Sequence, residues 1–317
     1  MNTSPHDAIE QAAEWAVELD STPSQDTKVA FQTWLSSDPE HQIAWQKINR
    51  FRQSYIDLKP HAAAVNVVQD TRQRQLTRRV FLERFMALGG LSIGAGLLAN
   101  RSPVGDWLAQ LPADQSTNVG EQRNILTTAG ALHLNTYSAI NMTEAENQIT
   151  IELIQGELAF TTEQTSTNKQ TIVCEQLKLY PHNANYALRR HQSGEYTVSV
   201  QKGHVTARLV GQERTIHAQQ SLNITNHQFK DLVAAQPYAF SWIKGRLEAS
   251  DISLDTWVAE ISRYTHSYIH LDSSLNTLAV MGSFPLHSLA ESYDLLQNAL
   301  PVTVQSPLPY VTFIRPS

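Results

Sequence analysis

The sequence is poor in cysteine and in basic residues, and its first residues do not have the pattern of a leader. Its single cysteine, Cys174, can form neither an internal disulfide nor a thiolate metal site. Lys and Arg number 24 against 30 Asp and Glu, and the net charge of -6 excludes a dedicated nucleic-acid binder, whose affinity comes from clustered cations. Because Met1 to Asp20 has no basic region followed by an apolar run, we expect no signal peptide there.

Signatures of catalysis, cofactors and metals are missing as well. There is no Walker loop, no dinucleotide-binding glycine pattern after a strand and no spaced Cys/His set. Residues 90–94, GLSIG, match the nucleophile elbow of hydrolases, but they lie inside an apolar run, where such spacing is typical of helix contacts in lipid. His266 and His270 have no third ligand nearby, so we interpret them as ordinary histidines. We therefore predict no catalytic residue, no cofactor, no metal and no enzymatic activity.

Residues 6–58 show the apolar spacing of three short helices. Ile9, Ala13 and Ala16 recur at intervals of three to four residues. Phe31 with Trp34, and Phe51 with Tyr55, repeat this spacing in the next two segments. Residues 1–60 hold nine acidic and five basic side chains, a balance of -4 that argues against a DNA-reading helix-turn-helix. We predict that these residues form an all-α domain that binds another protein.

An apolar run occupies residues 80–100, after a basic linker at residues 61–79. As a helix it would be about 30 Å long, the thickness of the hydrocarbon core of a bilayer. A buried core helix is the alternative, but the run holds four glycines, each of which costs about 1 kcal/mol in a helix. Five arginines precede the uncharged part of the run, residues 85–99, and one follows within twenty residues of its end, which predicts a cytoplasmic N-terminus. Residues 77–82, TRRVFL, at the boundary between the linker and the run, resemble the twin-arginine export motif, whose signal residues would be Arg78, Arg79, Phe81 and Leu82.

Beyond about residue 120 the periodicity changes from helix to strand. Residues 120–235 are short runs rich in Ile, Val, Leu and Thr, broken by Gly and Asn, which is typical of antiparallel strands joined by hairpins. Residues 240–317 twice show the order strand, helix, strand and end in one more strand. The predicted fold class is multidomain: a small all-α N-terminal domain, one transmembrane helix, an all-β middle domain and a small α+β C-terminal domain of two β-α-β units.

Several stretches resemble a known family. Residues 31–45, FQTWLSSDPEHQIAW, fit the pattern F-x-x-W-L-x-x-x-P-x-H-x-x-A-W at every fixed position. Further along, the chain carries IELIQGELAF with Gly156 and Glu157, then YTVSVQKGHV, FSW and EISRYTHSYIHLD with Arg263 and Tyr264. Over nearly its whole length the sequence is similar to FecR-type sigma-factor regulators, the inner-membrane transducers of cell-surface signalling in Gram-negative bacteria.

The resemblance implies a transmembrane anti-sigma factor or sigma regulator. Its helical domain would bind an extracytoplasmic-function sigma factor, and its C-terminal domain would contact the signalling domain of a TonB-dependent outer-membrane receptor for an iron chelate. An intramembrane or periplasmic protease would release the sigma factor, and no direct contact with nucleic acid is implied. Members of the family inhibit their sigma factor, are needed for its activity, or do both in turn. The implied location is the inner membrane, crossed once, with the C-terminal domains in the periplasm.

Candidate contact residues follow from this resemblance and from the prominence of aromatic side chains in protein interfaces. Each candidate in the helical domain could equally fill the core of so small a domain. The candidates for binding the sigma factor are Trp15, Leu19, Phe31, Trp34, Leu35 and Trp45. The candidates for contacting the receptor are Trp257, Arg263 and Tyr264.

The chain departs from the family pattern at one chemically important place. Many members carry a Gly-Thr dipeptide in the β domain, where some cleave themselves by attack of the Thr hydroxyl on the preceding carbonyl. Here the corresponding residues 177–186 read LKLYPHNANY, and no Gly-Thr occurs in the chain, so we predict no self-cleavage by this route. Two other functions stay open: an exported membrane-anchored hydrolase and a structural envelope protein. A hydrolase would need paired carboxylates or a nucleophile with its base, and none is visible, since Glu152 and Glu157 could as well be surface charges.

Overall fold

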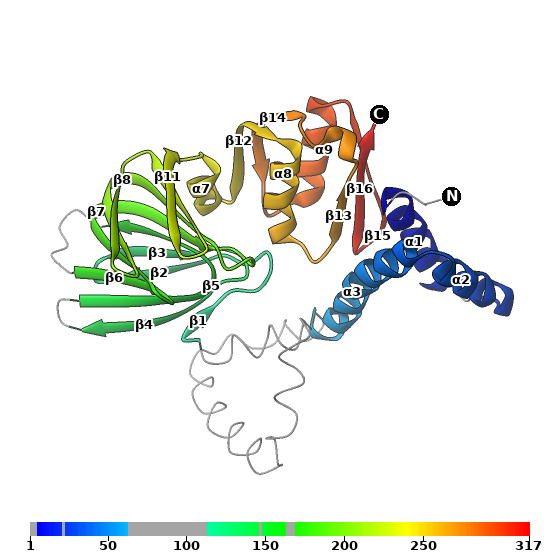
Figure 1. Cartoon of the computed structure of the whole chain (residues 1–317), viewed down its shortest axis with the longest axis horizontal. Coiled ribbons are helices and arrows are strands. Elements are labelled where there is room, and N and C mark those ends of the chain that lie inside the picture. Colours follow the sequence, from blue (N-terminus) through cyan, green and yellow to red (C-terminus); the bar gives the residue numbers. More distant parts are fainter. Residues whose placement is uncertain (1–4, 21–22, 63–112, 146–147, 163–168) are drawn as a thin grey trace, which may run out of the picture. The chain divides into compact units, whose positions relative to one another are not determined.

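The computed structural model describes residues 5–20, 23–62, 113–145, 148–162 and 169–317 (Figure 1). The N-terminal part is helical, with α1 (Pro5–Asp20), α2 (Gln25–Ser37) and α3 (Pro39–Ala62). Helix α2 begins where the Ser24 hydroxyl accepts a hydrogen bond from the Thr27 amide at 3.0 Å. Helix α3 begins after Asp38, whose carboxylate accepts from the Glu40 amide at 2.9 Å. Both caps satisfy amide groups that have no partner inside the helix, which fixes where each helix begins.

No helix within these described ranges is long and apolar enough to span a membrane. The longest, α3, has 24 residues but carries Lys47, Arg50 and Arg52 along its length, and one such charge costs about 2.5–3.5 kcal/mol or more at the bilayer centre. The finding overturns two predictions, the fold class with its transmembrane helix and the single-pass inner-membrane location. What the structure shows is N-terminal helices followed by a large, mostly β region. The predicted linker, span and export residues, at 61–79, at 80–100 and at Arg78, Arg79, Phe81 and Leu82, lie outside the described residues apart from the first two positions of the linker.

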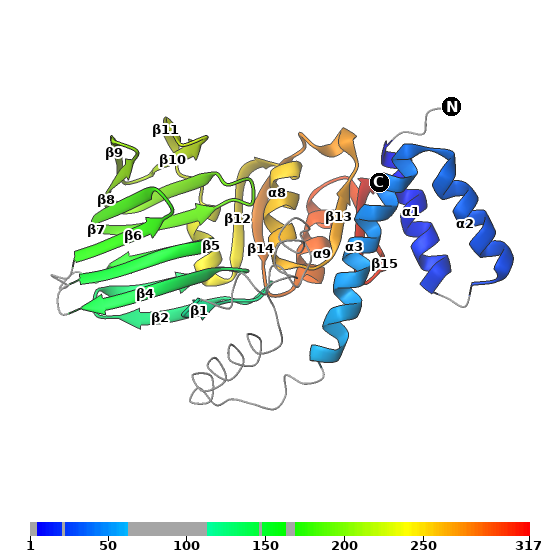
Figure 2. The same cartoon turned by 60° about the horizontal axis from the view of Figure 1, so that its bottom comes forward.

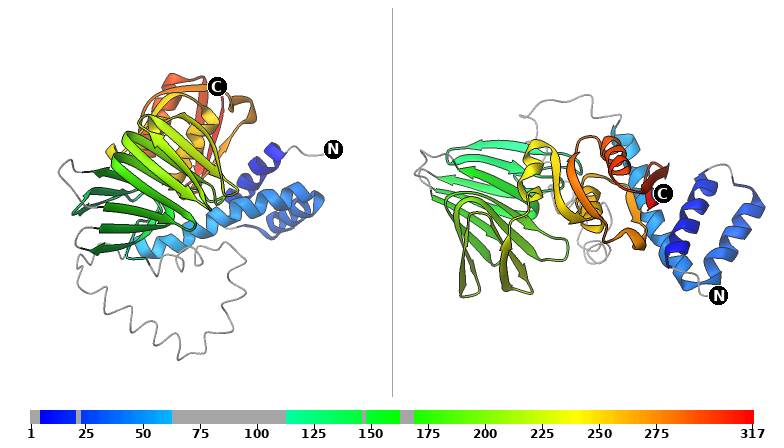
Figure 3. Two further views of the ribbon diagram at one scale, coloured as in Figure 1. Left: turned by 60° about the vertical axis from the view of Figure 1, so that its left-hand side comes forward. Right: turned by 90° about the horizontal axis from the view of Figure 1, so that it is seen from above.

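The β-rich region begins with a sheet that has eleven strands within the described residues. The sheet is strongly curved, and its strands follow one another mainly through hairpins (Figures 2 and 3). In chain order the strands are β1 (Gln115–Ser116), β2 (Arg123–Thr127), β3 (Gly130–Leu134), β4 (Ala139–Ala145), β5 (Gln148–Thr162), β6 (Lys169–Cys174), β7 (Leu177–Arg190), β8 (Tyr196–Leu209), β9 (Gln212–His217), β10 (Gln220–Thr225) and β11 (Gln228–Ala234).

Three long strands, β5, β7 and β8, each pair with different neighbours in their two halves and so connect two parts of the eleven-stranded sheet, which we call the bent sheet. The first half of β5 pairs with β4 and β6, whereas its second half, from Gly156 onward, pairs with β3 and β7. Likewise β8 pairs with β10 over residues 196–200 and with β9 over residues 204–209. Apolar side chains from both halves, such as Ile151 and Phe160 of β5, meet in one buried core.

The second half of β5 is covered on both faces. Leu158 and Phe160 belong to the core of the bent sheet, while Ala159 packs in the core of the region that follows. Ala187, which lies opposite Ala159 on β7, is buried in the same second core. A strand buried on both sides has no polar face, which explains the continuous apolar run LAF after Glu157.

The C-terminal region has two small sheets with helices between them (Figure 1). The elements are α7 (Tyr238–Ser241), η1 (Trp242–Lys244), β12 (Arg246–Ser253), α8 (Leu254–Ile261), η2 (Ser262–Tyr264), β13 (Tyr268–Leu271), η3 (Ser273–Leu275), β14 (Ala279–Pro285), α9 (Leu289–Ala299), β15 (Val302–Leu308) and β16 (Val311–Pro316). Strands β12 and β14 pair antiparallel, and β13, β16 and β15 form the other sheet, in which β13 and β16 are parallel. Trp257 of α8 is fully buried in the core that they share.

The strands that flank each helix do not pair with one another, which corrects the predicted β-α-β units. Strand β12 precedes α8 and pairs with β14, while β13 follows α8 and pairs with β16. Each strand-helix-strand segment therefore contributes one strand to each sheet. A β-α-β unit in the usual sense places its two strands in parallel within one sheet, and sequence order alone cannot distinguish the two arrangements.

Candidate functional site

An aromatic cluster joins the three N-terminal helices. Phe31 of α2 is buried at its centre, with ring centroids 5.7 Å from Trp15 of α1, 6.0 Å from Trp34 and 4.7 Å from Trp45 of α3. The indole nitrogen of Trp34 donates a hydrogen bond to the Gln11 side chain at 2.6 Å. The three tryptophans are only half-buried, so each one both fills the core and leaves part of its ring on the surface.

The structure thus brings together four of the six predicted sigma-factor contacts. Leu19 and Leu35 are half-buried at the ends of α1 and α2. The sequence reasoning missed a second group, the β-branched residues that stay exposed on the helices. These side chains are 43–58% exposed, and unpartnered apolar surface of this kind is typical of interaction sites. The group consists of Val17, Val29, Ile43 and Ile56.

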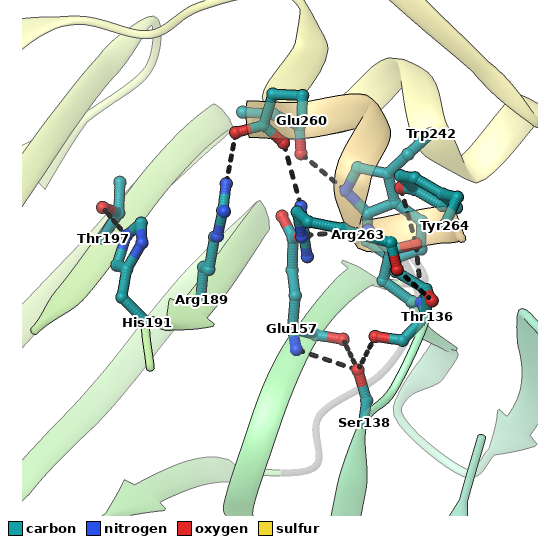
Figure 4. A network of polar contacts seen from close by, with 12 residues as sticks. Thr136, Ser138, Glu157, Arg189, His191, Thr197, Trp242, Glu260, Arg263 and Tyr264 are labelled. Atoms are coloured by element: carbon teal, nitrogen blue, oxygen red, sulfur yellow. Dashed lines mark hydrogen bonds and ion pairs between the residues drawn. The ribbon is translucent and has the colours of Figure 1, made fainter. Parts of the chain in front are cut away.

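A second candidate site is a buried junction of four charges between the bent sheet and the C-terminal region (Figure 4). Arg263 contacts Glu157 of β5 at 2.5 Å and Glu260 of α8 at 3.0 Å. Glu260 in turn contacts Arg189 of β7 at 2.5 Å. The side chains are only 5–21% exposed. Because two acids meet two arginines, the junction is electrically neutral, and two of its three ion pairs cross from one region to the other.

Neutral hydrogen bonds surround these charges. Asn135 donates from its amide nitrogen to Glu157 at 2.8 Å and accepts from the Tyr264 hydroxyl at 2.9 Å. The Thr136 hydroxyl donates to the backbone carbonyl of Arg263 at 3.0 Å. Buried charges are tolerable only when their remaining hydrogen-bonding capacity is filled, and the residues just after β3 supply that function here.

Local backbone geometry places Glu157 in the junction. Gly156 has φ +81°, and a Cβ atom at this position would collide with the backbone of Tyr137 and the side chain of Ser138. Only glycine combines such a conformation with so close an approach. The Ser138 hydroxyl then accepts from the Glu157 amide at 2.9 Å and donates to the Glu157 carbonyl at 3.0 Å, fixing the backbone that carries the carboxylate.

Electrostatics favour the charged form of these groups. Burial alone would raise the pKa of Glu260, but the nearby guanidinium groups of Arg263 and Arg189 outweigh burial and lower it. For Arg263, burial opposes the charge, whereas Glu157 and Glu260 raise its pKa. Burial, with help from the two arginines, lowers the pKa of the adjacent His191, so that imidazole is neutral at neutral pH. The junction can therefore hold two elements together as a set of paired charges.

The three predicted receptor contacts lie inside the molecule. Arg263 and Tyr264 are part of the junction, and the ring of Trp257 packs against Phe284 at 5.3 Å and Tyr293 at 6.4 Å. The dipeptides Gly156-Glu157 and Arg263-Tyr264, which carry part of the family resemblance, are therefore spatial neighbours. Sequence reasoning missed Glu260 as their partner, although its spacing of three residues from Arg263 on a helix is a signal for an ion pair.

The two carboxylates considered for a hydrolase have different surroundings. Glu152 is exposed and accepts a hydrogen bond from the Asn141 amide at 3.0 Å. Glu157 is buried and bound to Arg263. A glycosidase-like pair needs both carboxyl groups facing one substrate, and this arrangement does not provide that.

Comparisons with known proteins find one family model and two solved structures that are similar to parts of this chain. A family model described as a domain of unknown function, DUF4880, matches residues 10–51, the segment that contains the aromatic cluster. Two crystal structures, at 2.50 and 1.65 Å resolution and each described as a candidate anti-sigma factor from Parabacteroides distasonis ATCC 8503, share 15% identity with this chain. Their TM-scores are 0.50 and 0.51, and each comparison covers 64% of this chain and 98% of that chain. A search of curated proteins gives no match.

At such low identity the two crystal structures are evidence for a shared fold. The chain therefore combines a segment that matches DUF4880 with a fold similar to that of candidate anti-sigma factors. The predicted domain boundaries, at 1–60, 120–235 and 240–317, remain predictions.

Proposed function

We propose that this protein is a sigma-factor regulator and not an enzyme. The observation that carries the proposal is the match of DUF4880 to residues 10–51, where half-buried tryptophans and exposed β-branched side chains share one small helical module. Aromatic residues and exposed apolar patches are common anchors of protein interfaces. The fold similarity of the chain to candidate anti-sigma factors supports the same class.

The partners in this proposal follow from the FecR-type resemblance. Helices α1 to α3 bind a sigma factor of the extracytoplasmic-function class. The C-terminal region contacts the signalling domain of a TonB-dependent receptor, whose occupancy by an iron chelate is the signal, and a protease frees the sigma factor. The acidic character of residues 1–60, with nine acids against five bases, favours a basic surface on the sigma factor.

The buried positions of the three predicted receptor contacts give them an indirect role in this proposal. Trp257 is fully buried, and Arg263 and Tyr264 are engaged with the bent sheet. In their observed positions they hold the C-terminal region in shape and attach it to the sheet. Direct contact with a receptor would use exposed apolar side chains, of which Met281 on β14 is 69% exposed.

Binding assays with matched surface variants test the sigma-factor part. The full chain is measured against each extracytoplasmic-function sigma factor of the source organism, together with Ile43→Asp on α3 and Leu126→Asp in the sheet. Ile43 is 46% exposed and Leu126 is 88% exposed, so neither substitution disturbs a core. We expect Ile43→Asp to weaken binding at least about tenfold, or about 1.4 kcal/mol, as at an interface hot spot. Leu126→Asp should bind as the unaltered chain does.

Two results would refute this part of the proposal. Either no sigma factor in the panel binds, or one binds equally well to both variants. The receptor part is measured separately by titrating the signalling domain of a TonB-dependent receptor against the full chain and Met281→Asp. If Met281→Asp binds the signalling domain as tightly as the unaltered chain, Met281 is not a receptor contact. This outcome would leave the sigma-factor part of the proposal unaffected.

A further inference from the structure

Three histidines lie side by side across neighbouring strands, away from both candidate sites. His182 of β7 is the register partner of His204 on β8, and His204 is the register partner of His217 on β9. The ring centroids of His182 and His204 are 4.6 Å apart with an interplanar angle of 15°, and those of His204 and His217 are 6.0 Å apart. We call these three residues the histidine row.

The fold directs the histidine row outward. Val205 and Ile216, the neighbours of His204 and His217 in sequence, are buried in the sheet core, so alternation along each strand turns the histidines to the opposite face. His182 and His217 are exposed, and His204 is half-exposed between them. Within the described residues, no side-chain hydrogen bond or ion pair involves any of the three rings.

A glycine sets the register of the row. Gly203 has φ +74°, and a Cβ atom there would collide with the backbone carbonyl oxygens of His182 and Asn183. Asn183 is itself in the left-handed region at φ 45°, next to a bulge in the pairing of β7 with β8. This close approach brings His182 directly opposite His204 and locks the alignment on a rigid sheet.

The spacing of the rings suits a shared metal ion. Two nitrogens bound to one tetrahedral zinc ion, each at about 2.0–2.1 Å, lie about 3.3 Å apart. Directly opposite residues on adjacent strands have Cβ atoms about 4.5–5.5 Å apart, so two imidazoles can reach one ion from these positions. As the side chains stand, no group of three or more His, Cys, Asp or Glu in the described residues is arranged to hold a metal. The rings stack instead of converging, and bringing them together requires only rotation of surface side chains, which occurs within nanoseconds.

We propose that His182, His204 and His217 bind a divalent transition-metal ion, such as Cu²⁺ or Zn²⁺, on the outer face of β7 to β9. Neutral imidazole is the preferred nitrogen ligand of both ions, and Cu²⁺ binds more tightly than Ni²⁺ or Zn²⁺ to a given nitrogen site. His204 is the central ligand, because it alone has a histidine neighbour on each side. This site does not depend on the proposed function of the helices.

The site is tested on the full chain purified without a histidine tag, by calorimetric titration with CuCl2 and with ZnCl2. The variants are His204→Gln and, as a matched control, His287→Gln, which alters an exposed histidine outside the row. Mutating a residue that only supports a metal ligand lowers metal affinity about 10–100-fold, so loss of a ligand itself should lower the affinity at least as much. We expect His204→Gln to weaken Cu²⁺ binding at least about tenfold, and His287→Gln to leave it unchanged.

Electron paramagnetic resonance of the Cu²⁺ complex then counts the nitrogen ligands. Two or more imidazole nitrogens in the unaltered chain, with one fewer in His217→Gln, would support the row. Thermal unfolding of each metal-free variant checks that the sheet is intact. The proposal is overturned if Cu²⁺ does not bind, or if His204→Gln and His287→Gln bind it equally, because the metal then occupies scattered single histidines.

Discussion

Arg263 is the residue whose removal should do most damage to the attachment of the C-terminal region. Arg263→Ala leaves Glu157, with a side chain 5% exposed, without its cationic partner and weakens the surroundings of Glu260. Removing one member of a buried ion pair costs about 3–5 kcal/mol, because the remaining charge stays desolvated. We expect the lower part of this range, since Glu157 keeps its hydrogen bond from Asn135 and Glu260 keeps Arg189.

The effect of Arg263→Ala is measured by thermal unfolding at neutral pH. For a region of about 200 residues, each kcal/mol shifts the unfolding midpoint by about 2–4 °C, so a loss of about 3 kcal/mol corresponds to about 6–12 °C. Arg208→Ala is the matched control, because Arg208 forms an ion pair with Glu213 that is more than half exposed and such pairs contribute little. If Arg263→Ala unfolds at the same temperature as Arg208→Ala, the junction does not stabilise the fold and the reasoning is wrong.

Three further predictions concern the bent sheet. Gly156→Ala should destabilise the protein by more than Gly194→Ala in urea unfolding: both glycines have positive φ, which costs an alanine about 1–2 kcal/mol, but only at Gly156 would the methyl group meet neighbouring atoms. Equal losses would show that the close approach at Gly156 is unimportant. Because burial raises the pKa of the Cys174 thiol to about 12, a thiol reagent at pH 8 should label it only after unfolding, and rapid labelling of the native chain would contradict its burial. Burial and two arginines lower the pKa of His191 in the folded state, so the unfolded state binds the proton first and stability falls as the pH drops below about 6.5. His191→Gln should reduce this loss between pH 7.5 and 5, and an identical loss in the variant would exclude His191 as a contributor.

Local signals in the sequence predicted the elements, because helices and strands have their own periodicities. Leu254, Val258 and Ile261 recur at helical spacing, and they lie on α8 and in the core of the C-terminal region. Ile149 and Ile151 alternate with polar residues, and they are buried on β5 as alternation predicts. Such patterns depend only on which residues face one core. They do not specify which strand pairs with which, so the two sheets of the C-terminal region could not be derived from them.

The junction could not be predicted for a related reason. Glu157 and Arg263 are 106 positions apart, and a single acidic residue in a strand usually indicates a solvent-facing position. The apolar run that follows Glu157 was the only local sign that this part of β5 is covered on both faces. The family resemblance drew attention to both residues without indicating that they touch. Pairing of distant charges is a property of tertiary structure, and it becomes visible only when the positions of the strands are known.

The arrangement of the junction has a consequence for how the C-terminal region could separate from the sheet. Glu157 and Arg189 are direct register partners on β5 and β7, and Glu260 and Arg263 lie three residues apart on one helical turn. Each side of the junction therefore has one acid and one base within reach of each other, since opposed residues on adjacent strands are about 5 Å apart. When the C-terminal region separates from the bent sheet, Glu157 can pair with Arg189, and Glu260 keeps its ion pair with Arg263. Each charge then still has a partner of opposite sign. A junction that remains neutral in both states opens at lower cost than one that leaves a buried charge without a partner.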